Sequence, residues 1–258
     1  MSGLVYLMYH EIAGAGEATA RSDGGYLRYV IRSGTFDKQL DAIRAAGLRA
    51  IAAGTAVEAR NDVHGAVVLT FDDGCASDLL VAAPRLAERG WSATFYVTVE
   101  HVGRPAFLTA PQVRALADQG FEVGSHAYSH TYLTRLDAAA LRSQMCDSRA
   151  WLEDTIGREV RHLSCPGGRW SPAVAAAAGE CGFHSVAVSR PVPNGKGADL
   201  FRLGRFAVTA TMDHRAFGHV LHGRLPLAGR WKEQMTSVSR SLLGDRRYDA
   251  LRDRVLGR

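Results

Sequence analysis

The sequence predicts an α/β fold in which helices cover a largely parallel sheet. One observation is that helical segments repeatedly end in glycine and are followed by an apolar strand. A second is that several of these strands are continuously apolar, which is typical of strands buried on both faces. A third is the regular alternation of strand and helix, the pattern of βαβ units. The alternation alone leaves both an open sheet and a barrel as arrangements.

The helix ends support this reading because glycine adopts the left-handed conformation that closes a helix without steric cost. The segments that end in glycine just before a strand are AIRAAG, RLAERG, ALADQG, WLEDTIG and AAGECG. Helix starts are also visible. Thr35 precedes Phe36, Leu40 and Ile43 at helical spacing, and TAPQ from Thr109 predicts a capping box with proline in the first turn.

The strands are predicted from short apolar runs, in chain order. They are Leu4–Tyr9, Val67–Phe71, Ala93–Val97, Phe121–Gly124, Val160–Ser164, His184–Val188 and Phe206–Val208. In open sheets and barrels alike, functional residues gather at the carboxyl ends of parallel strands. The residues that directly follow these runs are therefore the candidates for a site.

The size and composition suit one domain with a sizeable core, since 47% of the 258 residues are apolar. We expect a domain at 1–225 and a basic helical tail at 226–258. No run approaches the ~18 apolar residues of a membrane span. The start, MSGLVYLMYHEI, lacks the basic segment and cleavage site of a secretory signal. From this we expect a cytoplasmic protein.

The charge and the cysteines exclude some classes of protein. The net charge is +5, but the basic residues are scattered without the dense tract of a nucleic-acid binder. Much of the excess lies in the tail, which we interpret first as a solvated helix and second as a contact for an anionic membrane surface. The cysteines contain no CxxC pair and predict reduced thiols. They are Cys75, Cys146, Cys165 and Cys181.

The apolar strand at Val67–Phe71 ends in two adjacent carboxylates, Asp72 and Asp73. Neighbouring like charges repel, and neither carboxylate is cheap to desolvate, so a positive partner is expected. After a later strand, His126 and His130 stand four residues apart. Two imidazoles and one carboxylate make a three-ligand set for a divalent cation with a position open for water.

Each of these features has an ordinary explanation when taken alone. Asp-Asp-Gly after a strand can be a turn, and most histidine pairs at this spacing bind nothing. Together, at strand ends in an α/β pattern, they favour a hydrolytic site. One aspartate then binds metal and the other accepts a proton from water, although the residues alone do not say which.

The motifs resemble those of the polysaccharide deacetylases, carbohydrate esterase family 4 with the NodB-homology fold. The similarity rests on TFDDG from Thr70, SHAYSH from Ser125 and SCPGGR from Ser164. MYH from Met8 is similar to the start of a bacterial branch that includes exopolysaccharide deacetylases. The resemblance implies a distorted (β/α)7-type barrel as a single domain, followed here by the C-terminal helical tail.

The resemblance also implies roles for individual residues. Asp72 corresponds to the general base, and Asp73, His126 and His130 to the ligands of one divalent ion, zinc or sometimes cobalt or nickel. The implied reaction is hydrolysis of an N-acetyl group on an amino sugar. The third motif implies substrate contacts at Pro166, Gly167 and Arg169, with a backbone N–H near Gly167 at the oxyanion.

The sequence departs from the family at two positions. Many members carry a third-motif arginine that pairs with the base, but Ser164 stands there, with Arg169 and Arg205 as candidate replacements. The late histidine that serves as general acid is poorly matched by His222. His10 ends the first strand, so we expect it to serve as the acid instead.

Three functions remain open at this level. They are a de-N-acetylase of a glycan or glycoconjugate, a related hydrolase of a small non-sugar amide or imide, and a metal-binding protein that has lost activity. Asp72 speaks against the third, because metal ligation alone does not need it. In the absence of a recognised export signal, a lipid-linked intermediate or a small glycoside is the expected substrate.

Overall fold

The structure is a computed structural model, which describes residues 3–14 and 19–224. The predicted tail at 226–258 lies outside the described residues, as does the last residue of the predicted domain. Met1–Gly223 is one compact unit. Within the described part of the chain, no helix combines the length and the apolar character that crossing a membrane requires.

The main sheet is parallel throughout and follows the strand order β10-β9-β8-β7-β6-β5-β1-β11, with β4 beside the first half of β5. β2 and β3 form a separate pair. The strands are β1 (Tyr6–Tyr9), β2 (Ile12–Ala13), β3 (Ile31–Arg32), β4 (Arg49–Ile51), β5 (Ala66–Phe71), β6 (Thr94–Val97), β7 (Glu122–Ser125), β8 (His162–Ser164), β9 (Ser185–Val188), β10 (Leu203–Gly204) and β11 (Phe206–Ala207).

The two edges of this sheet are joined by one short stretch of chain. Leu203 and Gly204 pair with β9, Phe206 pairs with β1, and only Arg205 lies between them. Because consecutive residues pair with opposite edges, the sheet is nearly closed into a barrel. The predicted distorted barrel is confirmed, and the choice between barrel and open sheet is decided by this crossing.

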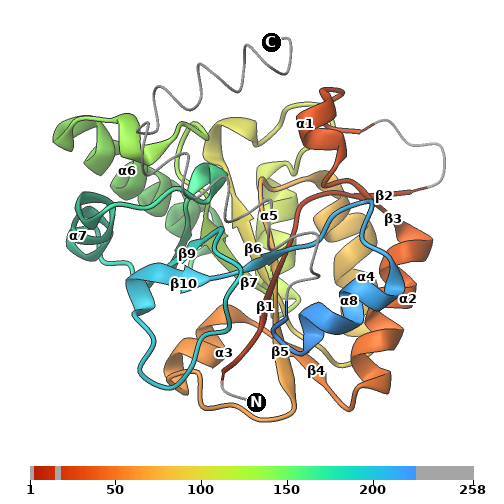
Figure 1. Ribbon diagram of the computed structural model, residues 1–258. Coiled ribbons are helices and arrows are strands. Elements are labelled where there is room, and N and C mark those ends of the chain that lie inside the picture. The colour runs from red at the N-terminus through yellow and green to blue at the C-terminus, as the bar shows by residue number, and fades with distance from the viewer. Residues whose placement is uncertain (1–2, 15–18, 225–258) are drawn as a thin grey trace. The chain divides into compact units, whose positions relative to one another are not determined.

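The helices lie outside the strands, with α6 and α7 on one side of β1 and α2, α4 and α8 on the other (Figure 1). They are α1 (Gly24–Leu27), α2 (Ser33–Ala45), α3 (Ala53–Glu58), α4 (Ala83–Ala87), α5 (Ala110–Asp118), α6 (Ala138–Ile156), α7 (Pro172–Glu180) and α8 (His214–Leu221). Shorter helical turns are η1 (Asp78–Ala82), η2 (Val99–His101), η3 (Leu133–Arg135), η4 (Pro166–Gly168) and η5 (Leu200–Arg202).

The predicted helix ends and caps agree with the structure. All five glycines at the predicted ends have positive φ, and they are Gly47, Gly90, Gly120, Gly157 and Gly182. The capping box joins Thr109 and Gln112 at the start of α5. Helix α2 buries Phe36, Leu40 and Ile43 as expected, although it begins at Ser33 rather than at Thr35.

A row of aromatic rings supports the strand ends that carry the site. Phe71, the last residue of β5, stacks on Tyr9 of β1 with ring centroids 5.3 Å apart, and on Phe95 of β6 at 4.8 Å. All three side chains are fully buried. The two aspartates that follow Phe71 therefore start from a backbone held by packing on both sides.

The prediction of four reduced cysteines is wrong for two of them. Cys146 of α6 and Cys181 at the end of α7 form a disulfide, whereas Cys75 and Cys165 are free and buried. The two bonded residues are 35 positions apart in sequence and have no motif around them. They meet because α6 packs against α7, which the spacing of cysteines alone does not show.

Candidate metal centre and active site

Asp72 and Asp73 lie at the carboxyl end of β5, and both are buried, with 2% and 3% of their surface exposed. The Asp72 N–H donates to the Tyr9 carbonyl at 3.0 Å, which fixes the chain at the strand end. Asp73 adopts a φ of +83°, a left-handed conformation that is unusual for any residue except glycine. The turn sends the two carboxylates to different partners.

Asp72 is held by Arg205. The guanidinium donates to both carboxylate oxygens, from Nη1 to Oδ1 at 2.7 Å and from Nη2 to Oδ2 at 2.8 Å. Ser164 completes the contact, since its hydroxyl donates to Asp72 Oδ2 at 3.1 Å and accepts from Arg205 Nη2 at 2.8 Å. The arginine side chain is fully buried, so this is a bidentate ion pair inside the barrel.

The pair keeps Asp72 ionised. Burial alone would raise the pKa of this carboxyl, but the charge and hydrogen bonds of Arg205, together with the nearby His126, outweigh it and lower the pKa. A carboxylate that stays charged in a buried position is suited to accept a proton. Of the two arginines proposed to replace the third-motif arginine, Arg205 is therefore the one that does so.

Asp73 faces the two histidines. Its Oδ1 lies 3.4 Å from His126 Nε2 and 3.2 Å from His130 Nε2. One ligand atom from each of the three residues lies within 4.8 Å of the others. The structure thus brings together the three predicted metal ligands, and Ala127 and His130 share the positive φ found at Asp73.

His126 is oriented through its other ring nitrogen. His126 Nδ1 donates to the Ser164 carbonyl at 2.9 Å, which leaves the lone pair of Nε2 directed at Asp73. Burial lowers the pKa of His126 to about 4, against the opposing charge of Asp72, so the ring is neutral at pH 7. A neutral imidazole with a carbonyl behind it is the usual form of a histidine metal ligand.

His130 and Asp73 interact directly through Nε2 and Oδ1. Burial lowers the pKa of His130, but the hydrogen bond and charge of Asp73 outweigh burial and raise it. Burial raises the pKa of Asp73, and the same contact with His130 outweighs it and lowers the pKa well below its usual range. The lowered pKa of Asp73 and the raised pKa of His130 both show that positive charge is stabilised beside the Asp73 carboxylate.

These residues fit a divalent cation on three counts. The donor set is two imidazole nitrogens and a carboxylate oxygen, the set found in catalytic zinc sites. The buried Oδ1 of Asp73 lies between the two imidazoles, 3.4 and 3.2 Å from their Nε2 atoms. The tautomer of His126 points a lone pair at the same place. Asp73, His126 and His130 would therefore hold the ion, and Asp72 would not.

His10 directly follows β1, at the same end of the barrel. Its ring stacks on Tyr29 with centroids 4.6 Å apart, and its buried Nδ1 has no hydrogen-bond partner. Burial lowers its pKa, and the charges of Asp73 and Asp72 act in the opposite direction. Because Tyr9 pairs with Phe71, His10 and Asp72 follow paired residues at the ends of neighbouring strands.

The third motif follows β8 and forms the turn η4. Gly167 has a φ of +64°, and a Cβ there would lie 2.5 Å from a ring carbon of Tyr132. The guanidinium carbon of Arg169 lies 4.0 Å from the centroid of the same ring. The Arg169 side chain is buried, so it is part of the site's wall and not a surface charge. Pro166 is buried in the same turn.

Two features were hidden from sequence reasoning. Ser164 was noted only for the arginine that is missing there, yet its hydroxyl and carbonyl orient Asp72 and His126. His222, the weaker candidate for the acid, is an exposed residue at the end of α8. No signal near Ser164 predicts its role, because that role depends on Arg205 crossing the barrel.

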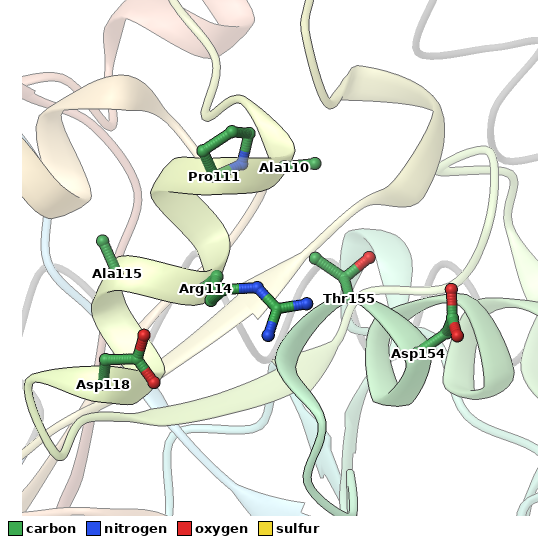
Figure 2. Close-up of a pocket in the computed structure, with 7 residues that line it drawn as sticks. All are labelled: Ala110, Pro111, Arg114, Ala115, Asp118, Asp154 and Thr155. Carbon is green, nitrogen blue, oxygen red and sulfur yellow. The ribbon is translucent and has the colours of Figure 1, made fainter.

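A groove of about 380 Å³ lies elsewhere, between α5 and α6 (Figure 2). The side chain of Arg114 reaches across it toward Thr155. Its lining residues are Ala110, Pro111, Arg114, Ala115, Asp118, Asp154 and Thr155. None of them is a residue of the candidate site.

The comparisons with known proteins agree with this geometry. Residues 59–186, about half of the chain, match the family described as polysaccharide deacetylase. YxkH of Bacillus subtilis is 28% identical over 152 residues, which cover 59% of this chain and 54% of that protein. The chitooligosaccharide deacetylase of Bradyrhizobium sp. is 29% identical over 132 residues, covering 48% and 57%. The chain thus spans little more than half the length of these relatives.

Solved structures extend the similarity over most of the fold. IcaB from Ammonifex degensii matches with a TM-score of 0.73 and 26% identity, covering 86% of this chain and 97% of that one. The Streptococcus pyogenes deacetylase PplD matches with a TM-score of 0.75 and 20% identity, covering 87% and 99%. The second similarity concerns the fold alone.

Proposed function

From the premise that this chain belongs to the polysaccharide deacetylase family of NodB type, we propose that it is a metal-dependent hydrolase. It removes an N-acetyl group from an amino sugar in a glycan or glycoconjugate. The bond that breaks is the amide C–N bond, and the products are acetate and a free amine. The proposal rests on the site and the family together, because the matches to these relatives cover little more than half of each of them.

One observation carries the proposal, which is the division of work between the adjacent aspartates. Asp73 directs one buried carboxylate oxygen at two histidines, whereas Asp72 forms a bidentate ion pair with Arg205. A protein that only binds metal has no need for a second buried carboxylate kept ionised by an arginine. A hydrolase needs such a group to accept a proton from water.

The proposed cofactor is one divalent ion held by Asp73, His126 and His130, with zinc first and cobalt or nickel as alternatives. Zinc accepts this mixture of nitrogen and oxygen ligands and leaves a position open in catalytic sites. When bound, the ion would supply a Lewis acid that polarises the substrate carbonyl and makes water more acidic.

The proton steps belong to residues of the chain. Asp72 accepts the proton of the attacking water, and Arg205 stabilises the carboxylate until then. We propose that His10 donates a proton to the departing nitrogen, because an amide anion is a very poor leaving group. His10 follows Tyr9, which pairs with Phe71 just before the two aspartates, and the lowered pKa of His10 makes the protonated ring a stronger acid.

The acetyl group is proposed to bind at the turn η4. Pro166 and Gly167 form its wall, and a backbone N–H near Gly167 stabilises the oxyanion. The ring of Tyr132 packs against Gly167, and Arg169, whose guanidinium stacks on that ring, is proposed to contact the substrate.

The natural substrate is proposed to be an acetylated amino sugar, either lipid-linked or in a small glycoside. A peripheral membrane contact through the tail at 226–258 would suit a lipid-linked substrate. The cytoplasmic location stays a prediction. The disulfide between Cys146 and Cys181 speaks against it, since such bonds persist mainly in oxidising compartments.

Acetate release from a panel of substrates tests the proposal. We would offer acetylated chitooligosaccharides, a lipid-linked acetylated sugar, a small acetylated glycoside and a cyclic imide. At least one sugar should release acetate. This release should stop when a chelator is added and resume when Zn²⁺ is restored. Asp72→Asn should retain the metal but lose most turnover. Turnover of the imide alone would assign the non-sugar reaction, and turnover unaffected by chelation would contradict the metal.

A further inference from the structure

The segment Thr98–Leu108, which follows β6, lies against both loops that carry the proposed metal ligands. On the side of Asp73, the Leu108 N–H donates to the Gly74 carbonyl and the Ala76 N–H donates to the Ala106 carbonyl, each at 2.9 Å. A short antiparallel bridge between Cys75 and Phe107 adds to this contact. We call Thr98–Leu108 the bridging segment.

On its other side, the bridging segment contacts the loop between His126 and His130. The Glu100 N–H donates to the Tyr128 carbonyl at 2.8 Å, and the Val99 N–H lies 3.5 Å from the Ala127 carbonyl. One segment therefore fixes the distance between two loops that are far apart in sequence. A change in the conformation of the bridging segment is therefore expected to alter the distance between the ligands.

The bridging segment carries His101, whose ring lies beside that of a ligand. Its ring centroid is 4.5 Å from that of Phe107 and 5.7 Å from that of His130. Burial lowers its pKa, while the charge of Asp73 and a hydrogen bond with the Asp73 backbone oppose that shift. The ring therefore neighbours both Asp73 and His130.

Both of these ligands need support from their surroundings. Asp73 has a φ of +83° and His130 one of +58°, conformations that persist only where neighbouring groups enforce them. The His130 side chain is also the most exposed of the three ligands, at 26%. His126 is held by the Ser164 carbonyl, and packing against His101 is the corresponding restraint on His130.

We propose that His101 is a positioning residue that holds Asp73 and His130 in the geometry that binds a divalent ion. The inference rests on the metal site of the proposed function but not on the reaction or its substrate. Residues that orient metal ligands typically contribute about 10- to 100-fold to metal affinity. His101 would do so without touching the ion.

The test is a calorimetric titration of the metal-free full chain with Zn²⁺, in the presence of a competing chelator. His101→Ala should weaken binding by about 10- to 100-fold and should change the visible spectrum of bound Co²⁺. His101→Phe, which keeps a ring between Phe107 and His130, should recover most of the affinity. His64→Ala is the matched control, because His64 is an exposed histidine outside the bridging segment, beside Asp62.

The outcomes separate this inference from the metal site itself. Zn²⁺ binding by His101→Ala equal to that of the His64→Ala control would overturn the positioning role alone. A loss as complete as in His130→Ala would make His101 a ligand and overturn it too. Failure of the unaltered chain to bind Zn²⁺ would remove the metal site and the inference together. If His101→Ala does not fold, His101→Asn carries the same comparison.

Discussion

At the scale of single residues, the adjacent aspartates differ because their partners differ. Asp72 meets a guanidinium and a hydroxyl, and Asp73 meets two imidazoles. The backbone achieves this separation through the positive φ of Asp73, which turns the second carboxylate away from the first. The base is thus defined by Arg205, a residue more than a hundred positions away in sequence.

Replacing Arg205 should change the pH dependence of activity. Because Arg205 lowers the pKa of Asp72, the carboxylate stays ionised as the pH falls. In Arg205→Gln that pKa rises, so the acidic limb of kcat/KM should move to higher pH. The buried charge left behind should also cost about 3–5 kcal/mol of stability.

The control for this experiment is the double variant Asp72→Asn/Arg205→Gln. It removes both charges, so it should regain much of the stability that Arg205→Gln loses, while remaining inactive. Urea unfolding and pH–rate profiles of the three proteins give the comparison. An acidic limb that stays in place in Arg205→Gln would show that Asp72 does not govern the reaction.

The second residue-scale prediction concerns the proton donor. His10→Ala should keep the metal and the fold but lower turnover by about 100-fold or more, the scale of general-acid catalysis. The loss should shrink for substrates with better leaving groups, whose departure needs less protonation. His222→Ala should be mild. The reverse order of the two variants would place the acid at the end of α8 and not at β1.

At the scale of elements, α6 and α7 are joined covalently as well as by packing. Closing a loop of 35 residues between Cys146 and Cys181 should stabilise the fold by about 4 kcal/mol, mainly by restricting the unfolded chain. The double variant Cys146→Ser/Cys181→Ser should lose about that amount in urea unfolding. Adding reductant should destabilise the unaltered chain and leave the double variant unchanged.

Counting thiols checks the same bond directly. In denaturant without reductant, two cysteines should react, Cys75 and Cys165, and all four should react after reduction. Four reactive thiols without reductant in freshly isolated protein would show that the bond does not form. That result would restore the expectation of a reducing compartment.

Some features of the helices and strands could be predicted from the sequence, and others could not. Local chemistry predicted the glycines that end helices, the capping box at Thr109 and a ligand set of two histidines and one aspartate, because each lies within a few residues of its signal. The choice of Asp73 over Asp72 came from the family resemblance. The disulfide and the Arg205–Asp72 pair depend on which elements meet in space. A lone arginine between two short strands carries no local mark of its partner.

At the scale of the whole described unit, closing the barrel and building the active site are one event. The chain pairs with β9 at Gly204 and with β1 at Phe206, and Arg205 between them is aimed at Asp72. Arg205 can therefore pair with Asp72, the proposed general base, only when the two edges of the sheet come together. We therefore expect damage to the closure to appear in catalysis as well as in stability.

Asn194 is the residue that tests this coupling. Its buried side chain donates to the Gly204 carbonyl and accepts from the Gly204 N–H, each at 2.8 Å, and its backbone pairs with Leu4. Asn194→Ala leaves two buried backbone groups of the closing strand without partners, which should cost about 2–4 kcal/mol. Arg205, the next residue, should then hold Asp72 less firmly, so the acidic limb of kcat/KM should move to higher pH.

Ser185→Ala supplies the matched control for Asn194→Ala. Ser185 is fully buried in β9 and its hydroxyl contacts His162 Nδ1 at 2.8 Å, so its loss also leaves a buried polar group unpaired. Within the described part of the chain, its hydroxyl makes no hydrogen bond to the closing strand. Both variants should unfold at lower urea, but only Asn194→Ala should shift the acidic limb. Equal shifts in both would mean that general loosening of the barrel, and not its closure at Gly204, sets the pKa of the base.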